Sequence, residues 1–193
     1  ELTSSGNTAP ITPRGTFTVY NLTIIGAGTS STNQNGGGDD AIALRPFASP
    51  SIYNAVFTDF NGQGIRLDTQ GGLSANNVVT SNYATINNTL WWGFVTNIGT
   101  ASQVVDNSSG NLARGNAVAE TFWTTAAFSN NIANPLLASI SRTNDGALDP
   151  RPLLGSPALT SSTVAPNDGF YSPVAFKGAF DRTNLWIRGW TAL

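Results

Sequence analysis

The stretch 41–63, AIALRPFASPSIYNAVFTDFNGQ, aligns without a gap over the stretch 64–86, GIRLDTQGGLSANNVVTSNYATI. Fixed-period self-similarity made of short β-rich runs and turn residues is typical of a solenoid, in which each coil buries its apolar face against its neighbours. The period here is about 23 residues, and similar residues recur at matching positions: Ile42 and Ile65, Leu44 and Leu67, Ser51 and Ser74, Asn54 and Asn77, and Val56 and Val79.

The apolar runs between turn residues are short and closely spaced, which leaves no room for helices between the strands. Parallel strands need a long connection, and a coil supplies it by turning corners through loops. We therefore predict an all-β right-handed parallel β-helix of about six coils over residues 16–140. Residues Ile42, Leu44, Val56, Ile65, Leu67 and Val79 are expected to point into its core.

The two ends of the chain differ in texture from this repeat. Residues 1–15 are rich in Pro, Ser, Thr and Gly and are expected to form a leading segment with little structure of its own. Residues 141–193 are rich in Pro, which cannot donate to a strand ladder. We expect them to wrap over the β-helix and to cap its exposed strand edges, with Trp186 and Trp190 as the apolar plug.

A second spacing is present in the same region. The pair Tyr20-Asn21, within the β-branched run 16–25, recurs as Tyr53-Asn54 after 33 residues. We interpret the excess over one coil as the polar loop before Asp40, because solenoid insertions lie in loops. Asn54 over Asn77 suits a bend, where the two amides either form a hydrogen-bonded ladder or are ordinary turn residues.

Composition excludes several classes of function. The 193 residues fit one domain, charged residues make up 10% and the net charge is -2, so nothing favours nucleic acid or an anionic membrane. His, Cys and Met are absent, which excludes Ser-His-Asp and Cys-His catalysis and imidazole or thiolate metal sites. No apolar stretch is long enough to span a membrane. The start at Glu1 fits a processed secreted protein or a piece of a longer one.

Several segments resemble one group of proteins. The runs DGALDPRPLLGSPAL (145–159) and FKGAFDRTNLWIRGWTAL (176–193), with SIYNAVFTDFNGQGIRLD and NNTLWWGF, are similar to secreted bacterial right-handed β-helix proteins with a pectin-lyase-like fold. The resemblance covers about 50–95 and 145–193, and the group has no established activity. It implies that members are often longer, so that this chain is a C-terminal half with earlier coils before it.

Polysaccharide hydrolases with β-helix folds use clustered Asp residues, and the lyases use Asp with calcium and a basic residue. The matching candidates are the acids Asp39, Asp40, Asp59 and Asp68, with Arg66 as substrate contact or base. Two carboxylates placed across a sugar would serve as acid and base. No motif fixes such a spacing, so solvated carboxylates remain the alternative, and we assign no catalytic residue and no cofactor.

Two further features point less specifically to a binding site. The run GGGDD, which ends at Asp40, offers oxygen ligands for calcium or is simply a flexible polar loop. Trp91 and Trp92 are adjacent, so on a strand one ring faces the core and the other faces out. The outward ring is able to stack on sugar or on protein, or it packs between loops.

These patterns favour an extracellular structural or cell-surface protein without catalytic activity, in which the β-solenoid itself carries the function. A chain without His or Met lacks groups that titrate near neutral pH or oxidise readily, which suits an exposed material. Its expected partners are copies of itself, assembled into a fibre, or cell-surface glycans. The alternative is a polysaccharide-binding or polysaccharide-degrading protein.

Overall fold

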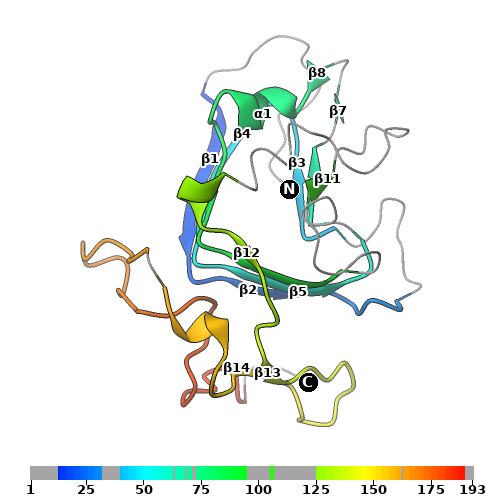
Figure 1. The fold of residues 1–193 in the computed structure, drawn as a ribbon, viewed down its shortest axis with the longest axis vertical. Helices are drawn as coiled ribbons and strands as arrows, with labels where there is room; N and C mark the ends of the chain where they lie inside the picture. Colours follow the sequence, from blue (N-terminus) through cyan, green and yellow to red (C-terminus); the bar gives the residue numbers. More distant parts are fainter. Residues whose placement is uncertain are drawn as a thin grey trace.

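The structure is a computed structural model, and it describes residues 13–31, 40–62, 64–67, 69–70, 73–94, 105–106, 125–161 and 163–189. Strands are the main regular elements of these residues, and most of the strands belong to three parallel sheets. In Figure 1 the three sheets lie on three sides of a shared interior.

The first sheet has three strands in the order β1-β4-β9, and its bounds are β1 Gly15–Tyr20, β4 Ala48–Tyr53 and β9 Thr85–Asn87. The second sheet has the order β12-β10-β5-β2, with β2 Thr23–Ile25, β5 Val56–Phe60, β10 Leu90–Phe94 and β12 Asn131–Ile132. The third sheet has the order β11-β6-β3, with β3 Ile42–Leu44, β6 Ile65–Leu67 and β11 Val105–Asp106. Every pairing inside these three sheets is parallel.

The remaining elements of the described residues are short. They are the antiparallel pair β7 Thr69–Gln70 and β8 Leu73–Ser74, the helix α1 Asn76–Thr80, the 3-10 helices η1 Ala126–Phe128 and η2 Pro157–Leu159, and the antiparallel pair β13 Leu137–Ser139 and β14 Asp149–Pro152.

The prediction of a continuous right-handed parallel β-helix with a terminal cap is wrong. The described strands form small, separate sheets of two to four strands, two of these sheets are antiparallel, and a helix interrupts the strands. Among the described strands the 23-residue repeat holds only between β3 and β6 of the third sheet, where Ile42 pairs with Ile65 and Leu44 with Leu67.

The physical reason is an insertion that the repeat does not reveal. Ser51 pairs with Thr85, not with Ser74, because β7, β8 and α1 occupy the chain between β6 and β9. Val79, expected to lie over Val56, is buried in α1 instead, and Val56 pairs with Leu90. The pairings of β1 with β4, β4 with β9, β2 with β5 and β5 with β10 therefore follow a spacing of 33 to 34 residues, as in Tyr20 with Tyr53.

The core lies between the three parallel sheets. Its largest members include Phe57 and Trp91, whose rings stack with centroids 4.2 Å apart, and both are completely buried. Leu44, Ile65 and Leu67 are buried in the same cluster. Because side chains alternate along a strand, residues on either side of these inward positions face outward.

The outer face of the second sheet is also covered. Val56, which was predicted to face inward, points away from the main core and forms a smaller buried cluster with Leu90 and with Ala158 from η2. This second contact explains why β5 is buried at nearly every position instead of alternating.

The C-terminal segment, residues 133–189, lies beside the second sheet (Figure 1, yellow to red). Lys177 and Gly178 donate backbone N–H groups to Ala158 and Asn54 at 2.7 Å, so the segment packs along the side of the sheets. Trp186 stacks on Phe180 with centroids 5.3 Å apart and remains 52% exposed, so it does not plug a sheet end. Trp190 lies outside the described residues.

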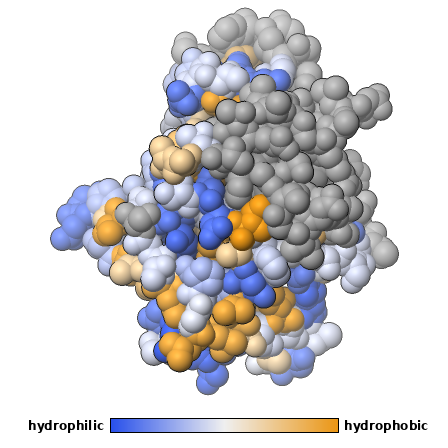
Figure 2. Space-filling view, in the orientation of Figure 1, coloured by the Kyte–Doolittle hydropathy of each residue, from blue (hydrophilic) through white to orange (hydrophobic). Residues whose placement is uncertain are grey.

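Figure 2 shows one face of the molecule in the orientation of Figure 1. Apolar residues gather in its lower part, where the C-terminal segment lies. The exposed large apolar residues of the C-terminal segment include Leu153, Leu154 and Phe170.

Candidate functional site

The strands β1, β2 and β3 are edge strands, one for each parallel sheet. They follow one another along the chain, and Phe17, Ile24 and Ile42, one from each strand, line a single pocket. The three edges therefore lie at one end of the sheets, which we call the β1–β3 end.

The backbone at this end offers hydrogen-bonding groups outward. The Ile42 N–H donates to the Gly64 carbonyl at 2.9 Å, so the backbone hydrogen-bonding groups of Ile42 point toward the neighbouring strand β6. The groups of the next residue, Ala43, point to the opposite side because directions alternate along a strand. No strand of the described residues pairs there.

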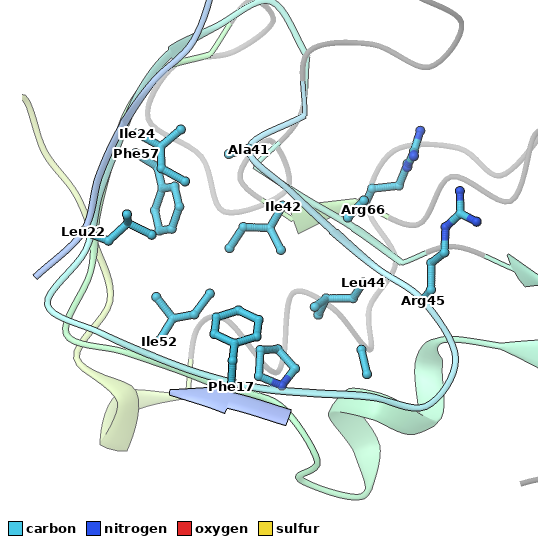
Figure 3. A pocket seen from close by; sticks show the side chains of 13 residues that line it. Phe17, Leu22, Ile24, Ala41, Ile42, Leu44, Arg45, Ile52, Phe57 and Arg66 are labelled. Carbon is cyan, nitrogen blue, oxygen red and sulfur yellow. The ribbon is translucent and has the colours of Figure 1, made fainter. Parts of the chain in front are cut away.

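The pocket at the β1–β3 end is apolar and has a volume of about 370 Å³. Figure 3 shows the side chains of Leu22, Ile42, Leu44 and Phe57 converging on it, whereas Arg45 and Arg66 point away. Phe17 stands at its mouth and is 41% exposed. The pocket is the open end of the core, since Leu22, Ile24 and Ile42 are only partly buried against the core cluster.

The end of the three sheets opposite the β1–β3 end is formed by the strands β9, β12 and β11. Phe128 and Ile132 are the partly buried apolar residues that pack on the core from that side. The first sheet ends at β9, where Asn130 Nδ2 donates to the Ile86 carbonyl at 2.8 Å. The second and third sheets end at β12 and β11.

A column of asparagines joins the first and second sheets. Asn21, Asn54 and Asn88 all have left-handed backbone, with φ of 58°, 54° and 57°. Asn tolerates this conformation better than other residues with side chains, which explains its use at the corner. Asn88 Nδ2 donates to Asn54 Oδ1 at 2.6 Å, and Asn54 Nδ2 donates to Asn21 Oδ1 at 3.5 Å. The column is structural.

The C-terminal segment is attached to this column. Asn54 Nδ2 donates to the Thr163 carbonyl at 2.5 Å, and Ser161 Oγ donates to Asn54 Oδ1 at 2.6 Å. The expected stacking of Asn77 over Asn54 does not occur, because Asn77 lies in α1.

The two tryptophans of β10 face opposite ways. Trp91 is fully buried and its Nε1 donates to Thr89 Oγ1 at 2.6 Å. Trp92 lines a cleft of about 220 Å³ on the outer face of the second sheet, together with Asp59, Gly93, Asn134 and Leu137. We call this the Trp92 cleft.

Asp59 at the Trp92 cleft forms an ion pair with Arg142, which also donates to the Gly26 carbonyl at 2.9 Å. Asp59 has left-handed backbone, with φ of 67°, and Gly93 on the adjacent strand has φ of 71°. A Cβ on Gly93 would lie 3.2 Å from the Asp59 amide nitrogen, so the close approach of the two strands requires glycine.

The two predicted acids within the described residues, Asp40 and Asp59, belong to separate ion pairs. Asp40 forms an ion pair with Arg66, with 3.3 Å between Oδ2 and Nη1, whereas Asp59 pairs with Arg142. Asp39 and Asp68 lie outside the described residues. Within the described ranges, no group of three or more acidic, His or Cys residues could hold a metal ion. The described helices include none that is long and apolar enough to cross a membrane.

Sequence reasoning missed Arg142, Phe17 and Asn88, and it noted Asn21 only as part of the recurring pair Tyr20-Asn21. For the two asparagines a signal existed, because the segments YNLTII, YNAVFT and NNTLWW recur at the spacing that the sheets adopt. No local signal marks Arg142, whose partner Asp59 is 83 positions away in the sequence.

The C-terminal carboxylates have shifted titration. Hydrogen bonds from Arg151 lower the pKa of Asp149, and backbone N–H donors lower the pKa values of Asp168 and Asp181. Burial lowers the pKa of Lys177, whose Nζ donates to the Thr160 carbonyl at 2.9 Å. None of these four residues lines the pocket at the β1–β3 end or the Trp92 cleft. Their hydrogen bonds lie within the C-terminal segment.

Comparison of the chain with protein-family models, with curated proteins and with solved structures finds no match. The resemblance of residues 50–95 and 145–193 to secreted β-helix proteins therefore stays a prediction.

Proposed function

We propose that this chain is a structural protein of the cell exterior, without catalytic activity, that assembles with copies of itself through the β1–β3 end. The observation that carries the proposal is the meeting of three edge strands around one apolar pocket. An open sheet edge is a template for pairing with another chain, and an apolar surface between three such edges adds a driving force for burial.

The geometry favours a second copy joined head to tail. The β1–β3 end is hollow, so two such ends placed face to face would leave a larger cavity. The opposite end carries partly buried Phe128 and Ile132, with the edges β12 and β11 running in the same parallel sense as β2 and β3. A head-to-tail contact that does not close by rotation produces a filament.

The composition supports a passive and exposed role. The chain contains no His, Cys or Met, so it lacks the imidazole group that titrates near neutral pH and the side chains that oxidise most readily. Its polar surface relies on Asn, Ser and Thr instead of ions, and charged residues are only 10% of the chain. These properties suit a durable assembly outside the cell.

Cross-linking tests the geometry, because any introduced cysteine is unique in this chain. Ala43, Arg66 and Asp106 occupy successive strands in one register column of the third sheet. In a head-to-tail stack, position 106 of one copy lies beside position 43 of the next. A mixture of Ala43→Cys and Asp106→Cys proteins should therefore give a mixed dimer with a short bismaleimide reagent, and neither protein should cross-link alone. Absence of the mixed dimer, or efficient cross-linking of Ala43→Cys alone, would contradict this arrangement.

A further inference from the structure

We propose that the Trp92 cleft binds a neutral sugar ring of a polysaccharide. The cleft lies on the outer face of the second sheet, between strands β5 and β10 and the chain that follows Asn134. It is separate from the β1–β3 end, where Phe17 and Ile42 line the pocket, and this binding goes beyond the self-assembly proposed above.

The cleft combines an apolar ring with hydrogen-bonding groups. Trp92 supplies an aromatic surface that faces away from the core, since its neighbour Trp91 is fully buried and directions alternate. The apolar C–H face of a sugar packs on such a ring, as apolar groups do on indole. Leu137 and Pro135 extend the apolar wall on the other side.

The polar rim suits hydroxyl groups. The Asp59 carboxylate lines the cleft and accepts hydrogen bonds, and the partly exposed Arg142 guanidinium that pairs with it donates them beside the cleft. Asn134 Oδ1 accepts from the Leu136 N–H at 2.8 Å, which fixes this side chain and leaves its amide hydrogens as further donors.

The charges at the cleft favour a neutral ligand. Asp59 and Arg142 neutralise each other, and Arg142 is held in place by the Gly26 carbonyl. An anionic sugar would have to displace Asp59 from its partner. Among the described lining residues Asp59 is the one carboxylate, whereas glycoside hydrolysis uses two, so the cleft supports binding without cleavage.

The backbone is held in an unusual shape at this cleft. Asp59 and Gly93 both have left-handed φ, in adjacent strands of one sheet. Such conformations are uncommon inside strands and concentrate at functional sites, because the surrounding structure must hold them. Here they bring a carboxylate onto the same face as Trp92.

The test titrates the full chain with neutral hexasaccharides of β-linked glucose, xylose and mannose, and with oligogalacturonate as the acidic comparison, by calorimetry. We expect saturable binding of a neutral ligand, and loss of at least about tenfold in affinity in Trp92→Ala. Asp59→Asn should weaken binding while leaving the fold intact by circular dichroism. The matched control is Trp186→Ala, because Trp186 is an exposed tryptophan at a different place.

Four results would overturn the proposal: no binding of any neutral hexasaccharide at millimolar concentration, binding of the acidic ligand alone, equal loss in Trp186→Ala and Trp92→Ala, or unchanged affinity in Trp92→Ala. Phe17→Asp should leave sugar binding unchanged, since Phe17 lines the other pocket. This variant separates a failure of the self-assembly proposal from a failure of the sugar site.

Discussion

Asn88 donates from Nδ2 to Asn54 Oδ1 over 2.6 Å, and both residues have left-handed backbone. The contact links corresponding corners of two successive strand layers and continues into the C-terminal segment through Ser161 and Thr163. One amide therefore holds together three parts of the chain that are distant in sequence.

Replacement of Asn54 should separate the two contributions of this residue. Asn54→Ala removes several buried hydrogen bonds and places Cβ of alanine in left-handed backbone, so we expect a loss of about 3 kcal/mol or more in the free energy of unfolding. Asn54→Gly keeps the backbone freedom and should lose about 1 kcal/mol less. Urea titration followed by circular dichroism measures both.

Asn77→Ala is the matched control for Asn54. Asn77 lies in α1, and its buried Oδ1 has no hydrogen-bond partner in the described part of the chain. Alanine favours helix and removes an unpaired polar atom, so this variant should be as stable as the unchanged chain or slightly more stable. Equal losses at Asn54 and Asn77 would refute the role given to the asparagine column.

A pair of glycine substitutions tests the close approach of β5 and β10. Gly93 and Gly146 both have left-handed backbone, with φ of 71° and 70°. A Cβ at Gly93 would meet Asp59, whereas at Gly146 it would meet nothing within 4 Å. Both alanine variants should lose about 1 kcal/mol from backbone strain, and Gly93→Ala should lose clearly more. Equal losses of unfolding free energy in Gly93→Ala and Gly146→Ala would contradict a steric requirement for glycine between β5 and β10.

The tryptophans of β10 should differ sharply in their contribution to stability. Trp91 is fully buried, stacks on Phe57 and donates to Thr89, so Trp91→Ala should cost about 3 to 5 kcal/mol. Trp92 faces the cleft, and Trp92→Ala should cost much less. Thermal unfolding of the two variants checks the expectation, and a larger loss in Trp92→Ala would place the wrong ring in the core.

The C-terminal segment should weaken in acid. The pKa of Asp149 is lowered from its ordinary 3.8, mainly by hydrogen bonds from Arg151. A lowered carboxyl pKa stabilises the fold above the unfolded value, and this stabilisation is lost as the pH falls below 3.8 through the folded pKa. Asp149→Asn should therefore reduce the urea midpoint at pH 7, and the difference from the unchanged chain should disappear toward pH 2. A difference that persists at the lower pH would contradict this assignment.

The sequence predicted β structure and parallel pairing of Ile42 with Ile65, but it misplaced the register elsewhere. The 23-residue repeat was the more visible signal, whereas the 33-residue recurrence of Tyr20-Asn21 describes the first sheet. Helix α1 has only five residues, too few for a helical period to show in the sequence. A local insertion of this kind breaks a repeat without leaving a periodic signal.

The candidate surfaces depend on contacts between distant residues, which one sequence does not reveal. Trp92 and Asp59, which line the cleft, were recognised separately, but Arg142, the ion-pair partner of Asp59, could not be assigned without the fold. Similarly, Phe17 lies in the β-branched run 16–25, and only the sheet order shows that its strand is an edge. The C-terminal segment was expected over the strand edges and instead binds the corner at Asn54, through the Asn54 amide, the Ser161 hydroxyl and the Gly178 N–H, which are far from one another in the sequence.

The most direct test of self-assembly is the molar mass of the chain in solution as a function of concentration, measured by sedimentation equilibrium. Phe17→Asp places a charge at the mouth of the apolar pocket, and Phe170→Asp makes the same change at a phenylalanine that is 84% exposed elsewhere. We predict that the mass of the unchanged chain and of Phe170→Asp rises with concentration beyond a dimer, while Phe17→Asp stays a monomer. A monomeric unchanged chain at millimolar concentration, or association that survives in Phe17→Asp, would contradict the account.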